Sequence, residues 1–534
     1  MHTFLYGAPG SGKSTIGRIL AERLDLPFID LDAMIEYVAA RPIRDIFASE
    51  GEPGFRARER VALTRAADAP ASVIALGGGA LLDPDNRALA ERAGTILCLE
   101  ADAATLQSRV SKTPGQRPLL KPSSSGGVHA ATLARLLADR APHYAAFPRR
   151  LTVSDRPAAA TADAAQAALG HYRVTGMGTP YDVRAGAGLL DTIGPRFREL
   201  GCGTRTVIVG DTHTLPLYGE RVAASLRAHG ITAALAAIPA GETTKTLATV
   251  ATLWPAFLAA GIERGHAVIA LGGGVVGDLT GFAAATWLRG IRWIGLPTTL
   301  LAMVDSSLGG KTGADLPEGK NLIGAFHPPA LVLADTATLA TLPACELRCG
   351  LAEAIKHAVI SDPGLLDTLP RLASIGALAD DAPSPALAAA DWLAPFVARA
   401  MAVKINVIRQ DPFEKGHRAA LNLGHTLGHG IETATRFAVR HGEGVSIGTV
   451  LEARLAEAAG LAPSGLADRL ADLFASVGLP VTLPAGIDTE AILAAMAHDK
   501  KKADGQVRFA LPAAIGDVRT GVTVTQDEIK RVLR

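Results

Sequence analysis

The sequence of 534 residues has little cysteine, no long apolar run and no marked excess of either charge. Its four cysteines, Cys98, Cys202, Cys345 and Cys349, are too few and too scattered for a disulfide framework. Cys345 and Cys349 could share one helix face, but buried, inert thiols are the favoured interpretation. No segment offers the about 20 consecutive apolar residues of a membrane-spanning helix. The N-terminus shows no cationic, apolar and small-residue leader, so we expect a cytoplasmic protein without membrane contact.

Charges of the two signs almost cancel. Lys and Arg number 53 and Asp and Glu number 52, which leaves a formal net charge of +1. This balance gives no global field that would attract nucleic acid or an anionic membrane. The chain is 48% hydrophobic and 20% charged, with 56 glycines and 32 prolines, which is typical of a globular protein with many short loops. Its length exceeds one ordinary hydrophobic core, so about three or four domains are expected.

Two different glycine-rich loops occur in this chain. The first is Gly7-Ala-Pro-Gly-Ser-Gly-Lys-Ser-Thr15, and the second is Gly272-Gly-Gly-Val-Val-Gly-Asp278. Because the two loops belong to different chemistries, one active site is insufficient to explain the protein. A fusion is the first hypothesis.

The order of apolar segments predicts an α/β protein in three parts. Runs at residues 72–76 and 95–99 alternate with helical stretches, as in a parallel sheet covered on both faces. Runs at 206–209, 233–238 and 267–271 repeat this pattern, and the chain then becomes rich in Ala and Leu. We predict a P-loop domain with a parallel sheet over residues 1–165, a Rossmann-like α/β lobe over 172–330 and an α-helical, metal-binding lobe over 331–534.

The first loop has the form of a phosphate-binding loop. Gly7 and Gly12-Lys13-Ser14 have the required spacing, and the loop lies between a predicted strand and a predicted helix. Its glycines let backbone N–H groups approach phosphates, Lys13 reaches the outer phosphates, and Ser14 ligates Mg²⁺. By itself the loop indicates only the binding of a nucleoside triphosphate.

Further motifs accompany this loop in a fixed order, at residues 28–36, 50–59, 77–79, 116–120 and 140–144. By these motifs the first domain resembles shikimate kinase over nearly its whole length. The resemblance implies that ATP and Mg²⁺ bind to Gly10, Ser11, Gly12, Lys13, Ser14, Thr15, Asp30 and Arg117. It implies that shikimate binds to Asp32, Arg56, Gly78, Gly79 and Arg140, with Asp32, Lys13 and Arg117 as catalytic residues.

Each of these side chains has a plainer interpretation when it is taken alone. Asp30 or Asp32 could cap the following helix, and Arg56 or Arg140 could form surface ion pairs. Together with the loop they favour a site for a carboxylated acceptor. Arginine forks suit carboxylates, and phosphoryl transfer depends mostly on positioning and charge neutralisation.

The second loop carries a weak signal by itself, since tight packing of a strand against a helix also selects glycine. It follows a predicted strand and precedes a helix, so its backbone could approach a pyrophosphate. Asp211, Gly241-Glu-Thr-Thr-Lys245 and Thr298-Thr299 follow other predicted strands. They belong to the sheet edge where such folds bind ligands, which strengthens the prediction of a nucleotide site.

Histidines and a carboxylate in the helical region predict a metal site. His425 and His429 lie four apart on one predicted helix face, and His441-Gly-Glu443 follows. With Glu353, two histidines and a carboxylate suit Zn²⁺ with an open coordination position. A single histidine is more often a packed or surface residue, and His357 keeps that interpretation.

Basic side chains in glycine-rich or apolar contexts indicate a phosphate-bearing, polyhydroxylated substrate. Taken singly, each is explained as surface charge. They are Lys311, Lys320 beside Asn321, Lys356, Lys404, Arg418 and the pair Lys500 and Lys501.

The chain from about Val174 onward resembles 3-dehydroquinate synthase. The resemblance rests on the second glycine loop, residues 296–311, 319–326 and 413–418, the paired histidines and His441-Gly-Glu443. Small departures are Met303, where relatives more often have Gln, and Gly430 and Gly444, where Ala is usual. The resemblance implies Zn²⁺, with cobalt as an alternative, on Glu353, His425 and His441. It implies NAD on Asp211, Gly241, Glu242, Lys245, Gly274, Val275, Val276, Gly277, Asp278, Thr298, Thr299, Lys311 and Lys320. Contacts with substrate phosphate and hydroxyls are implied for Arg289, Asp305, Lys311, Lys320, Asn321, Lys356, Lys404, Arg418 and Lys501, and catalytic roles for His429, Lys311, Lys356 and Glu414.

The reaction implied by this second resemblance runs at one site. NAD⁺ removes hydride from the carbon whose hydroxyl Zn²⁺ polarises, phosphate is eliminated, hydride returns, and the opened sugar closes by an intramolecular aldol step. The two resemblances together imply a bifunctional enzyme of the shikimate pathway, a kinase and a lyase, that acts on shikimate, ATP and a heptulosonate phosphate. They also imply a homodimer formed through the synthase part. Two alternatives stay open: another sugar-phosphate cyclase, and an N-terminal domain that is a non-catalytic nucleotide-binding regulator.

Overall fold

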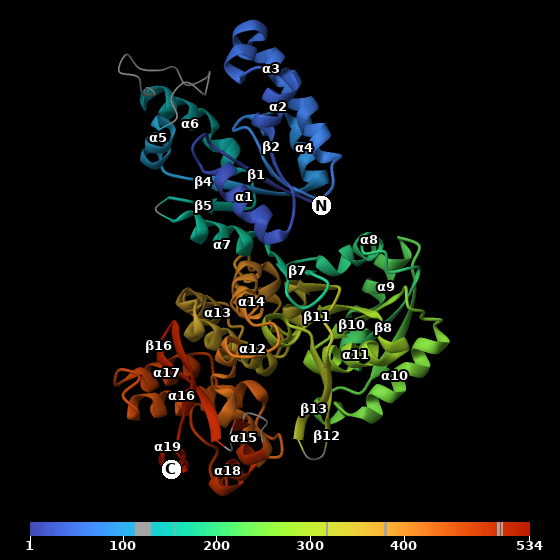
Figure 1. The fold of residues 1–534 in the computed structure, drawn as a ribbon, viewed down its shortest axis with the longest axis vertical. Coiled ribbons are helices and arrows are strands. Elements are labelled where there is room, and N and C mark those ends of the chain that lie inside the picture. The colour runs from blue at the N-terminus through green and yellow to red at the C-terminus, as the bar shows by residue number, and fades with distance from the viewer. Residues whose placement is uncertain (113–129, 155, 317–318, 379–381, 499–501, 504–505) are drawn as a thin grey trace. The chain divides into compact units, whose positions relative to one another are not determined.

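The chain consists of two compact units (Figure 1). Unit 1 is Met1–Arg173 and unit 2 is Val174–Arg534. The computed structural model describes residues 1–112, 130–154, 156–316, 319–378, 382–498, 502–503 and 506–534. Arg117, Lys500 and Lys501 lie outside these described residues. Within them, no helix is both long enough and apolar enough to cross a membrane.

Unit 1 is built on a five-stranded parallel sheet with the strand order β2-β3-β1-β4-β5. Alternate residues of the central strand enter different buried clusters: Phe4 and Tyr6 join one, and Leu5 joins the other. Helices therefore cover both faces of the sheet. The strands are β1 (His2–Gly7), β2 (Phe28–Asp30), β3 (Val73–Ala75), β4 (Gly94–Glu100) and β5 (Arg150–Thr152). The helices are α1 (Lys13–Leu24), α2 (Leu31–Ala39), α3 (Ile43–Ala67), α4 (Pro84–Ala93), α5 (Ala103–Ser111), α6 (Ala130–Ala145) and α7 (Ala158–Leu169).

The loop after β1 requires glycine for steric reasons. Gly7 has a φ of 134°, and a Cβ atom there would lie 2.2 Å from the carbonyl oxygen of Leu99 on β4. Gly10 and Gly12 have φ values of 87° and 90°, which residues with a side chain rarely adopt. The glycines therefore fix the backbone path that leads into α1.

Unit 2 contains a seven-stranded sheet with the order β6-β7-β14-β11-β10-β8-β9, paired in parallel from β7 to β9. Val207 and Val209 enter one buried cluster and Ile208 enters another, so this sheet is also covered on both faces. The strands are β6 (His171–Val174), of which only Val174 is counted with unit 2, β7 (Tyr181–Gly186), β8 (Arg205–Asp211), β9 (Thr232–Ile238), β10 (Ala267–Gly272), β11 (Arg292–Pro297) and β14 (Leu331–Asp335). The helices of this lobe are α8 (Ile193–Glu199), α9 (Glu220–Arg227), α10 (Leu247–Ala259) and α11 (Gly274–Thr286).

The sheet continues beyond residue 330, where the sequence placed the start of the helical lobe. β14 is the fully buried run Leu-Val-Leu-Ala-Asp, and five buried residues in a row suit a central strand rather than a helix. It pairs with β7 and β11 inside the sheet. The α/β lobe therefore ends after β14, and the antiparallel hairpin of β12 (Lys311–Leu316) and β13 (Gly319–Phe326) precedes that strand.

The second lobe of unit 2 is mainly helical, as predicted, but it also contains a small sheet that was not predicted from the sequence. Its helices are α12 (Ala344–Ile360), α13 (Leu369–Ser374), α14 (Leu393–Gln410), α15 (His425–Ala434), α16 (His441–Ala458), α17 (Leu466–Ser476), α18 (Thr489–His498) and α19 (Gln526–Val532). The antiparallel strands are β15 (Lys502–Ala503), β16 (Gln506–Ala514) and β17 (Asp517–Thr523). Phe509 and Leu511 of β16 both enter the cluster that α15, α16 and α18 also line. A period of two residues puts both side chains on one face only in a strand.

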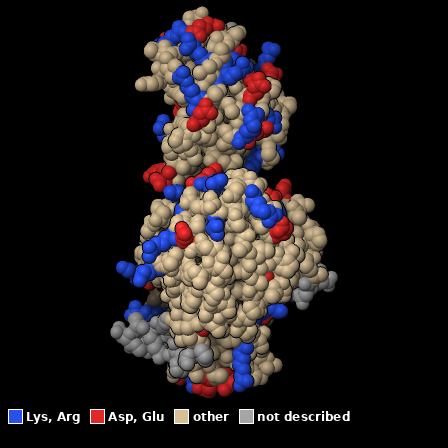
Figure 2. Space-filling model, turned by 90° about the vertical axis from the view of Figure 1, so that its right-hand side faces the viewer, with Lys and Arg blue, Asp and Glu red and all other residues tan. Residues whose placement is uncertain are grey.

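Charged side chains on the surface are mixed in sign. On the face that Figure 2 shows, lysines and arginines are interspersed with aspartates and glutamates, beside a broad area of uncharged residues. Buried charged residues, by contrast, include Glu59 in unit 1 and Glu353, Lys356 and Glu432 in unit 2. Because buried charges are costly without partners, these residues point to the places where chemistry is done.

Candidate functional site

In unit 1, the first glycine loop holds Lys13 against its own backbone. The Lys13 Nζ atom donates to the carbonyl oxygens of Gly7, at 2.8 Å, and Ala8, at 3.0 Å. Since α1 begins at Lys13 and Gly12 provides no side-chain cap, the N–H groups of its first turn lack partners within the helix. Loop, ammonium group and helix end together suit the binding of phosphates.

Ser14 and Asp30 place two oxygen atoms side by side next to this loop. The Ser14 hydroxyl donates to Asp30 Oδ2 at 2.6 Å, and Asp30 Oδ1 accepts from the Ala33 N–H at 3.4 Å, which caps α2. Asp30 therefore acts as a helix cap and also faces Ser14. A hydroxyl and a carboxylate oxygen fit Mg²⁺, which accepts such ligands beside substrate phosphates.

The predicted acceptor residues converge on the segment Gly77–Gly79. Arg140 Nη1 donates to the carbonyl oxygen of Gly78 at 3.1 Å. A Cβ atom at Gly79 would lie 2.8 Å from Arg56 Nη2 and 3.3 Å from Arg140 Nη1, and one at Gly77 would lie 3.1 Å from Asp32 Oδ1. Two guanidinium groups and a carboxylate thus border one short segment. This arrangement suits a substrate that carries both a carboxylate and hydroxyls.

In unit 2, the second glycine loop joins β10 to α11, and Lys245 meets Asp278 beside it. Lys245 Nζ lies 2.6 Å from Asp278 Oδ2 and donates to Asn321 Oδ1 at 2.7 Å. Burial alone would lower the pKa of Lys245, but Asp278 and Glu242 outweigh it and raise that pKa. Lys245 is therefore held as an ammonium group among carboxylates.

The backbone of this second loop runs close to the loop after β11. The Thr298 N–H donates to the carbonyl oxygen of Gly272 at 3.0 Å, and a Cβ atom at Gly273 would lie 3.3 Å from Thr299 Cγ2. A Cβ atom at Gly277 would meet nothing within 4 Å. The start of α11 is therefore tight on the threonine side and open at Gly277.

Two other residues of the predicted NAD site have structural partners of their own. Asp211 Oδ1 accepts the N–H groups of His213 and Thr214, at 2.9 and 2.8 Å, and so closes the turn after β8. Val276 is buried in the core of the sheet, so only its backbone can face a nucleotide. Their assignment to NAD stays a prediction.

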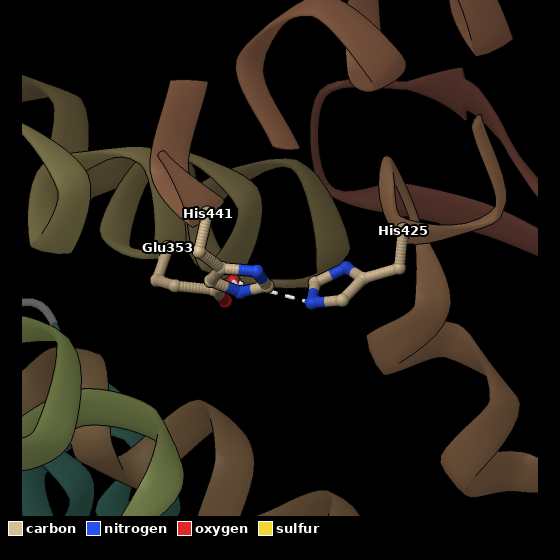
Figure 3. Close-up of side chains that lie close together, drawn as sticks. All are labelled: Glu353, His425 and His441. Atoms are coloured by element: carbon tan, nitrogen blue, oxygen red, sulfur yellow. Dashed lines mark ion pairs between the residues drawn. The ribbon is translucent and has the colours of Figure 1, made fainter. Parts of the chain in front are cut away.

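Glu353, His425 and His441 come together from three helices (Figure 3). Glu353 lies on α12, while His425 and His441 are the first residues of α15 and α16. Glu353 Oε1 lies 3.4 Å from the Nε2 atom of each histidine. Three donor atoms therefore face one point.

The spacing and chemistry of these donors fit a zinc ion. Ligand bonds of about 2.0 to 2.1 Å at tetrahedral angles separate ligand atoms by about 3.4 Å, which equals the two separations of 3.4 Å in the cluster. Within the described residues, the buried Glu353 Oε1 makes no hydrogen bond. His425 Nδ1 contacts the Leu423 carbonyl oxygen at 3.0 Å, and His441 Nδ1 contacts Glu432 Oε1 at 2.9 Å. These contacts leave both Nε2 atoms for a metal.

The carboxylates of this cluster stabilise positive charge, either on a protonated histidine or on a bound metal ion. Burial alone would lower the pKa of His441, but Glu432 and Glu353 outweigh it and raise that pKa to about 10. Burial alone would raise the pKa of Glu353, but Lys356 and His425 outweigh it and hold that pKa well below its usual range. A metal must displace the proton that His441 carries, so its affinity should fall as the pH falls.

Two buried lysines lie around the cluster. Lys356 contacts Glu353 and donates to the Leu421 carbonyl oxygen at 3.0 Å. Lys404 Nζ lies 2.8 Å from Asp305 Oδ1. Lys356 and Lys404 are only 1% and 7% exposed, so water solvates their ammonium groups poorly. Because a buried cation is stabilised by a nearby anion, these lysines suit the binding of an anionic, hydroxylated ligand.

The remaining predicted substrate residues lie in different settings. Lys311 pairs with Glu414, and the buried Arg418 donates to the Pro412 carbonyl oxygen at 2.5 Å. Arg289 has a φ of 69°, is exposed, and makes no hydrogen bond or ion pair within the part of the chain that the structure describes. The assignment of Arg289 to the substrate site stays a prediction.

The two other histidines of the region differ in their surroundings. The ring centre of His429 lies 5.3 Å from that of His425 and 5.9 Å from that of His441, so it borders the metal cluster. His357 is fully buried, and its Nδ1 atom contacts the Ala400 carbonyl oxygen at 3.0 Å. One ring nitrogen of His357 also lies within 4.8 Å of carboxylate oxygens of Asp305 and Glu353, and its interpretation as a packed histidine stays a prediction.

Comparisons with known proteins match both units. Residues 9–169 match the family model of shikimate kinase, and residues 235–349 and 350–502 match the N-terminal and C-terminal models of 3-dehydroquinate synthase. The 3-dehydroquinate synthase of Synechocystis is 44% identical over 359 residues, which cover 66% of this chain and 97% of that protein. The chain belongs to the 3-dehydroquinate synthase family. Its unit 1 is a shikimate kinase domain, so the two glycine loops belong to a kinase and to a lyase.

Solved structures resemble the synthase unit. The 2-epi-5-epi-valiolone synthase of Streptomyces hygroscopicus, solved with NAD⁺ and Zn²⁺, is 33% identical, with a TM-score of 0.59 and coverage of 68% of this chain and 98% of that one. A 2-deoxy-scyllo-inosose synthase, solved with carbaglucose-6-phosphate, NAD⁺ and Co²⁺, is 26% identical, with a TM-score of 0.61 and coverage of 68% and 99%. The α/β lobe and helical lobe of unit 2 thus form the common fold of these synthases.

Four residues without a predicted role support the two sites. In the kinase unit, Arg56 donates to the buried Glu59 at 2.6 Å, and the Tyr144 hydroxyl donates to the Gly78 carbonyl oxygen at 2.7 Å. In the synthase unit, Glu452 accepts the N–H groups of Gly424 and Leu427, at 2.5 and 3.4 Å, and so anchors the start of α15 that carries His425. Glu432 is the fourth. The spacing of three residues between Arg56 and Glu59 was a usable signal, whereas the other partners are distant in sequence.

Proposed function

We propose that the chain carries two activities. The kinase unit transfers phosphate from ATP to shikimate and forms 3-phosphoshikimate. The synthase unit converts 3-deoxy-D-arabino-heptulosonate 7-phosphate to 3-dehydroquinate and phosphate. We further propose that the protein works in the cytoplasm as a homodimer formed through the synthase unit. The functional divisions we propose are those predicted from the sequence, residues 1–165, 172–330 and 331–534, except that the boundary at 330 moves to residue 335, because β14 (Leu331–Asp335) belongs to the α/β lobe.

The kinase unit offers each part that phosphoryl transfer requires. Ser14 and Asp30 would hold Mg²⁺, whose chemistry is to neutralise the phosphates. Lys13 would neutralise negative charge on the phosphoryl group as it is transferred. The guanidinium groups of Arg56 and Arg140 would bind the shikimate carboxylate. Asp32 would accept the proton of the attacking hydroxyl. Support comes from the convergence of Asp32, Arg56 and Arg140 on Gly77–Gly79 and from the shikimate kinase model that the unit matches.

Glu59→Gln is expected to raise the KM for shikimate by about 10- to 100-fold with a smaller change in kcat, because Arg56 loses its charged, buried partner. Steady-state kinetics at saturating ATP measure this split. Burial raises the pKa of Glu59, so the KM of the wild type should also rise as the pH falls toward that raised pKa. The matched control is Glu52→Gln, since Glu52 contacts the same Arg56 at 3.0 Å but is 51% exposed. Equal effects of the two variants would contradict the role of Glu59.

The synthase unit offers a metal site and a nucleotide site within one folded unit. Glu353, His425 and His441 would hold Zn²⁺, and the loop around Asp278 with Lys245 would hold NAD⁺. When bound, these groups supply a Lewis acid and a reversible hydride acceptor. Residues of the chain would do the rest, with the two buried lysines and Asp305 orienting phosphate and hydroxyls and a His429 ring nitrogen exchanging a proton.

The convergence of Glu353, His425 and His441 at 3.4 Å separations is the observation that carries the synthase assignment. It supports a metal-dependent enzyme and speaks against a purely structural role of these helices. The 44% identity to a 3-dehydroquinate synthase favours dehydroquinate chemistry over that of other sugar-phosphate cyclases.

The full-length protein assayed with both substrates, with each nucleotide omitted in turn, tests the proposal. Of the two nucleotides, only ATP should be required for phosphorylation of shikimate, and only NAD⁺ for phosphate release from the heptulosonate phosphate. After chelation, Mg²⁺ should restore only the kinase, and Zn²⁺ or Co²⁺ should restore the synthase. Recovery of the synthase with Mg²⁺ would reject the assigned metal. Turnover of a different seven-carbon sugar phosphate, without 3-dehydroquinate formation, would reject the substrate.

A further inference from the structure

Glu432 is a buried carboxylate that joins two functional residues of the synthase unit. It lies on α15, and 1% of its side chain is exposed. Its Oε1 atom lies 2.9 Å from His441 Nδ1, and its Oε2 atom lies 2.8 Å from Lys320 Nζ. Each carboxylate oxygen therefore has its own partner, one a metal-site histidine and the other a lysine of the hairpin strand β13.

Lys320 extends this contact toward the nucleotide loop. Besides Glu432 at 2.8 Å, its Nζ atom lies 3.1 Å from Glu242 Oε1, and it lies 4.6 Å from the ring centre of Phe437. Glu432 and Phe437 belong to the helical lobe, whereas Glu242 and Lys320 belong to the α/β lobe and its hairpin. Lys320 therefore joins the two lobes of unit 2.

The chain of contacts ends at Asp278. The residue after Lys320, Asn321, accepts a hydrogen bond from Lys245 at 2.7 Å, and Lys245 lies 2.6 Å from Asp278. Glu242, the other partner of Lys320, also helps to raise the pKa of Lys245 and so favours its charged form. Alternating charges thus run from the metal cluster through Glu432 and Lys320 to the second glycine loop.

Burial makes this series of contacts more than a surface network. Lys320 is 18% exposed and Lys245 is 6% exposed at the side chain. Removing one partner of a buried pair leaves the other charge without a partner in a place that water solvates poorly, which is strongly destabilising. The positions of Glu432 and Lys320 are therefore interdependent, in contrast to those of solvent-exposed pairs, which contribute little to stability.

We propose that Glu432 is a positioning residue that couples the metal site to the nucleotide site. It accepts from His441 Nδ1 and thereby presents the Nε2 lone pair to the metal, while its second oxygen sets the place of Lys320. A metal that fixes His441 fixes Glu432 and Lys320 with it, so Glu242 and Lys245 are ordered before the nucleotide arrives. Linkage requires the reverse as well, so that NAD⁺ strengthens metal binding by the same factor. This inference rests on the metal and NAD⁺ sites proposed above.

Titration of the full-length protein with NAD⁺, with zinc present and after chelation, tests the coupling. For the wild type, we expect NAD⁺ to bind about 5- to 150-fold more tightly when zinc is present, the usual range of such coupling. Glu432→Gln should reduce this ratio toward one and weaken zinc binding by about 10- to 100-fold, as is common when the partner of a ligating histidine is lost. Calorimetry, or competition with a chromophoric chelator, measures both affinities without any assay of turnover.

Lys320→Met separates coupling from simple support of the histidine. This variant keeps both Glu432 and His441, so zinc affinity without NAD⁺ should fall far less than in Glu432→Gln, while the affinity ratio collapses. Glu346→Gln, at a 47% exposed carboxylate on α12, is the matched control and should keep the full ratio. If Glu432→Gln fails to fold, the Lys320 variant alone still tests the coupling between zinc and NAD⁺ binding. An unchanged ratio in Lys320→Met, or a wild-type ratio of one, overturns the coupling, whereas a wild type that binds neither zinc nor NAD⁺ overturns the proposed function instead.

Discussion

Replacing Lys13 by alanine is expected to abolish ATP-dependent phosphorylation of shikimate, with a fall in kcat of at least about 10²- to 10³-fold. The ammonium group of Lys13 lies within the first glycine loop, on the carbonyl oxygens of Gly7 and Ala8. There it would neutralise charge on the phosphoryl group in the transition state, where a single electrostatic contact is commonly worth this factor. A coupled assay of ADP release with shikimate as the acceptor measures the loss.

Phosphate release by the synthase unit should be the same in the Lys13 variant as in the wild type. The two units have separate buried clusters, so a change at the loop of α1 should not alter the helices that hold Glu353. Lys112→Ala, at an exposed lysine after α5, is the matched control and should leave both activities intact. Loss of both activities in the Lys13 variant would show that the sites are not independent.

Glu353→Gln should have the opposite effect to Lys13→Ala, with loss of the synthase activity and an intact kinase activity. An amide is a poor zinc ligand, and it would leave Lys356 without its carboxylate partner in a fully buried place. We expect zinc affinity to fall by more than about 100-fold, because loss of a mere partner of a ligand already costs about 10- to 100-fold. Phosphate release from the heptulosonate phosphate should fall to background, while shikimate phosphorylation stays intact.

Metal analysis of the purified Glu353 variant, together with both activity assays, measures this outcome. Glu346→Gln is again the control, since Glu346 lies two turns earlier on α12 and contacts Arg440 only at 3.9 Å. Full zinc content in Glu353→Gln would show that the metal is held elsewhere. Melting temperatures of both variants tell whether the loss reflects the site or the stability of α12.

Local sequence carries enough information to predict the parts of each site that a single segment defines. The glycine loop with Lys13 and Ser14 requires only one strand, one turn and one helix, and its spacing is fixed by phosphate geometry. His425 and His429 likewise share a face of α15. Their separate surroundings, with His425 beside Glu353 and His429 beside Glu432, depend on which helices pack against α15. No spacing within the segment specifies that packing.

Contacts between distant segments could not be predicted in the same way. Glu432 and Lys320 are 112 residues apart in sequence, and Tyr144 is 66 residues from Gly78. Buried acidic residues such as Glu432 look like ordinary surface positions of a helix until the opposing strand is known. The same reason explains β14, since its four apolar residues and one aspartate, next to helical sequence, form a strand only when neighbouring strands leave a place for it in the sheet.

Because two independently packed units share one chain, the cell always makes them in a fixed ratio. Each cluster described above draws its residues from one unit, so each unit has a core of its own on a common chain. One messenger then yields the two catalysts in equal number at every level of expression. Their relative flux must be adjusted through the turnover and saturation of each site, because transcription can no longer change their ratio.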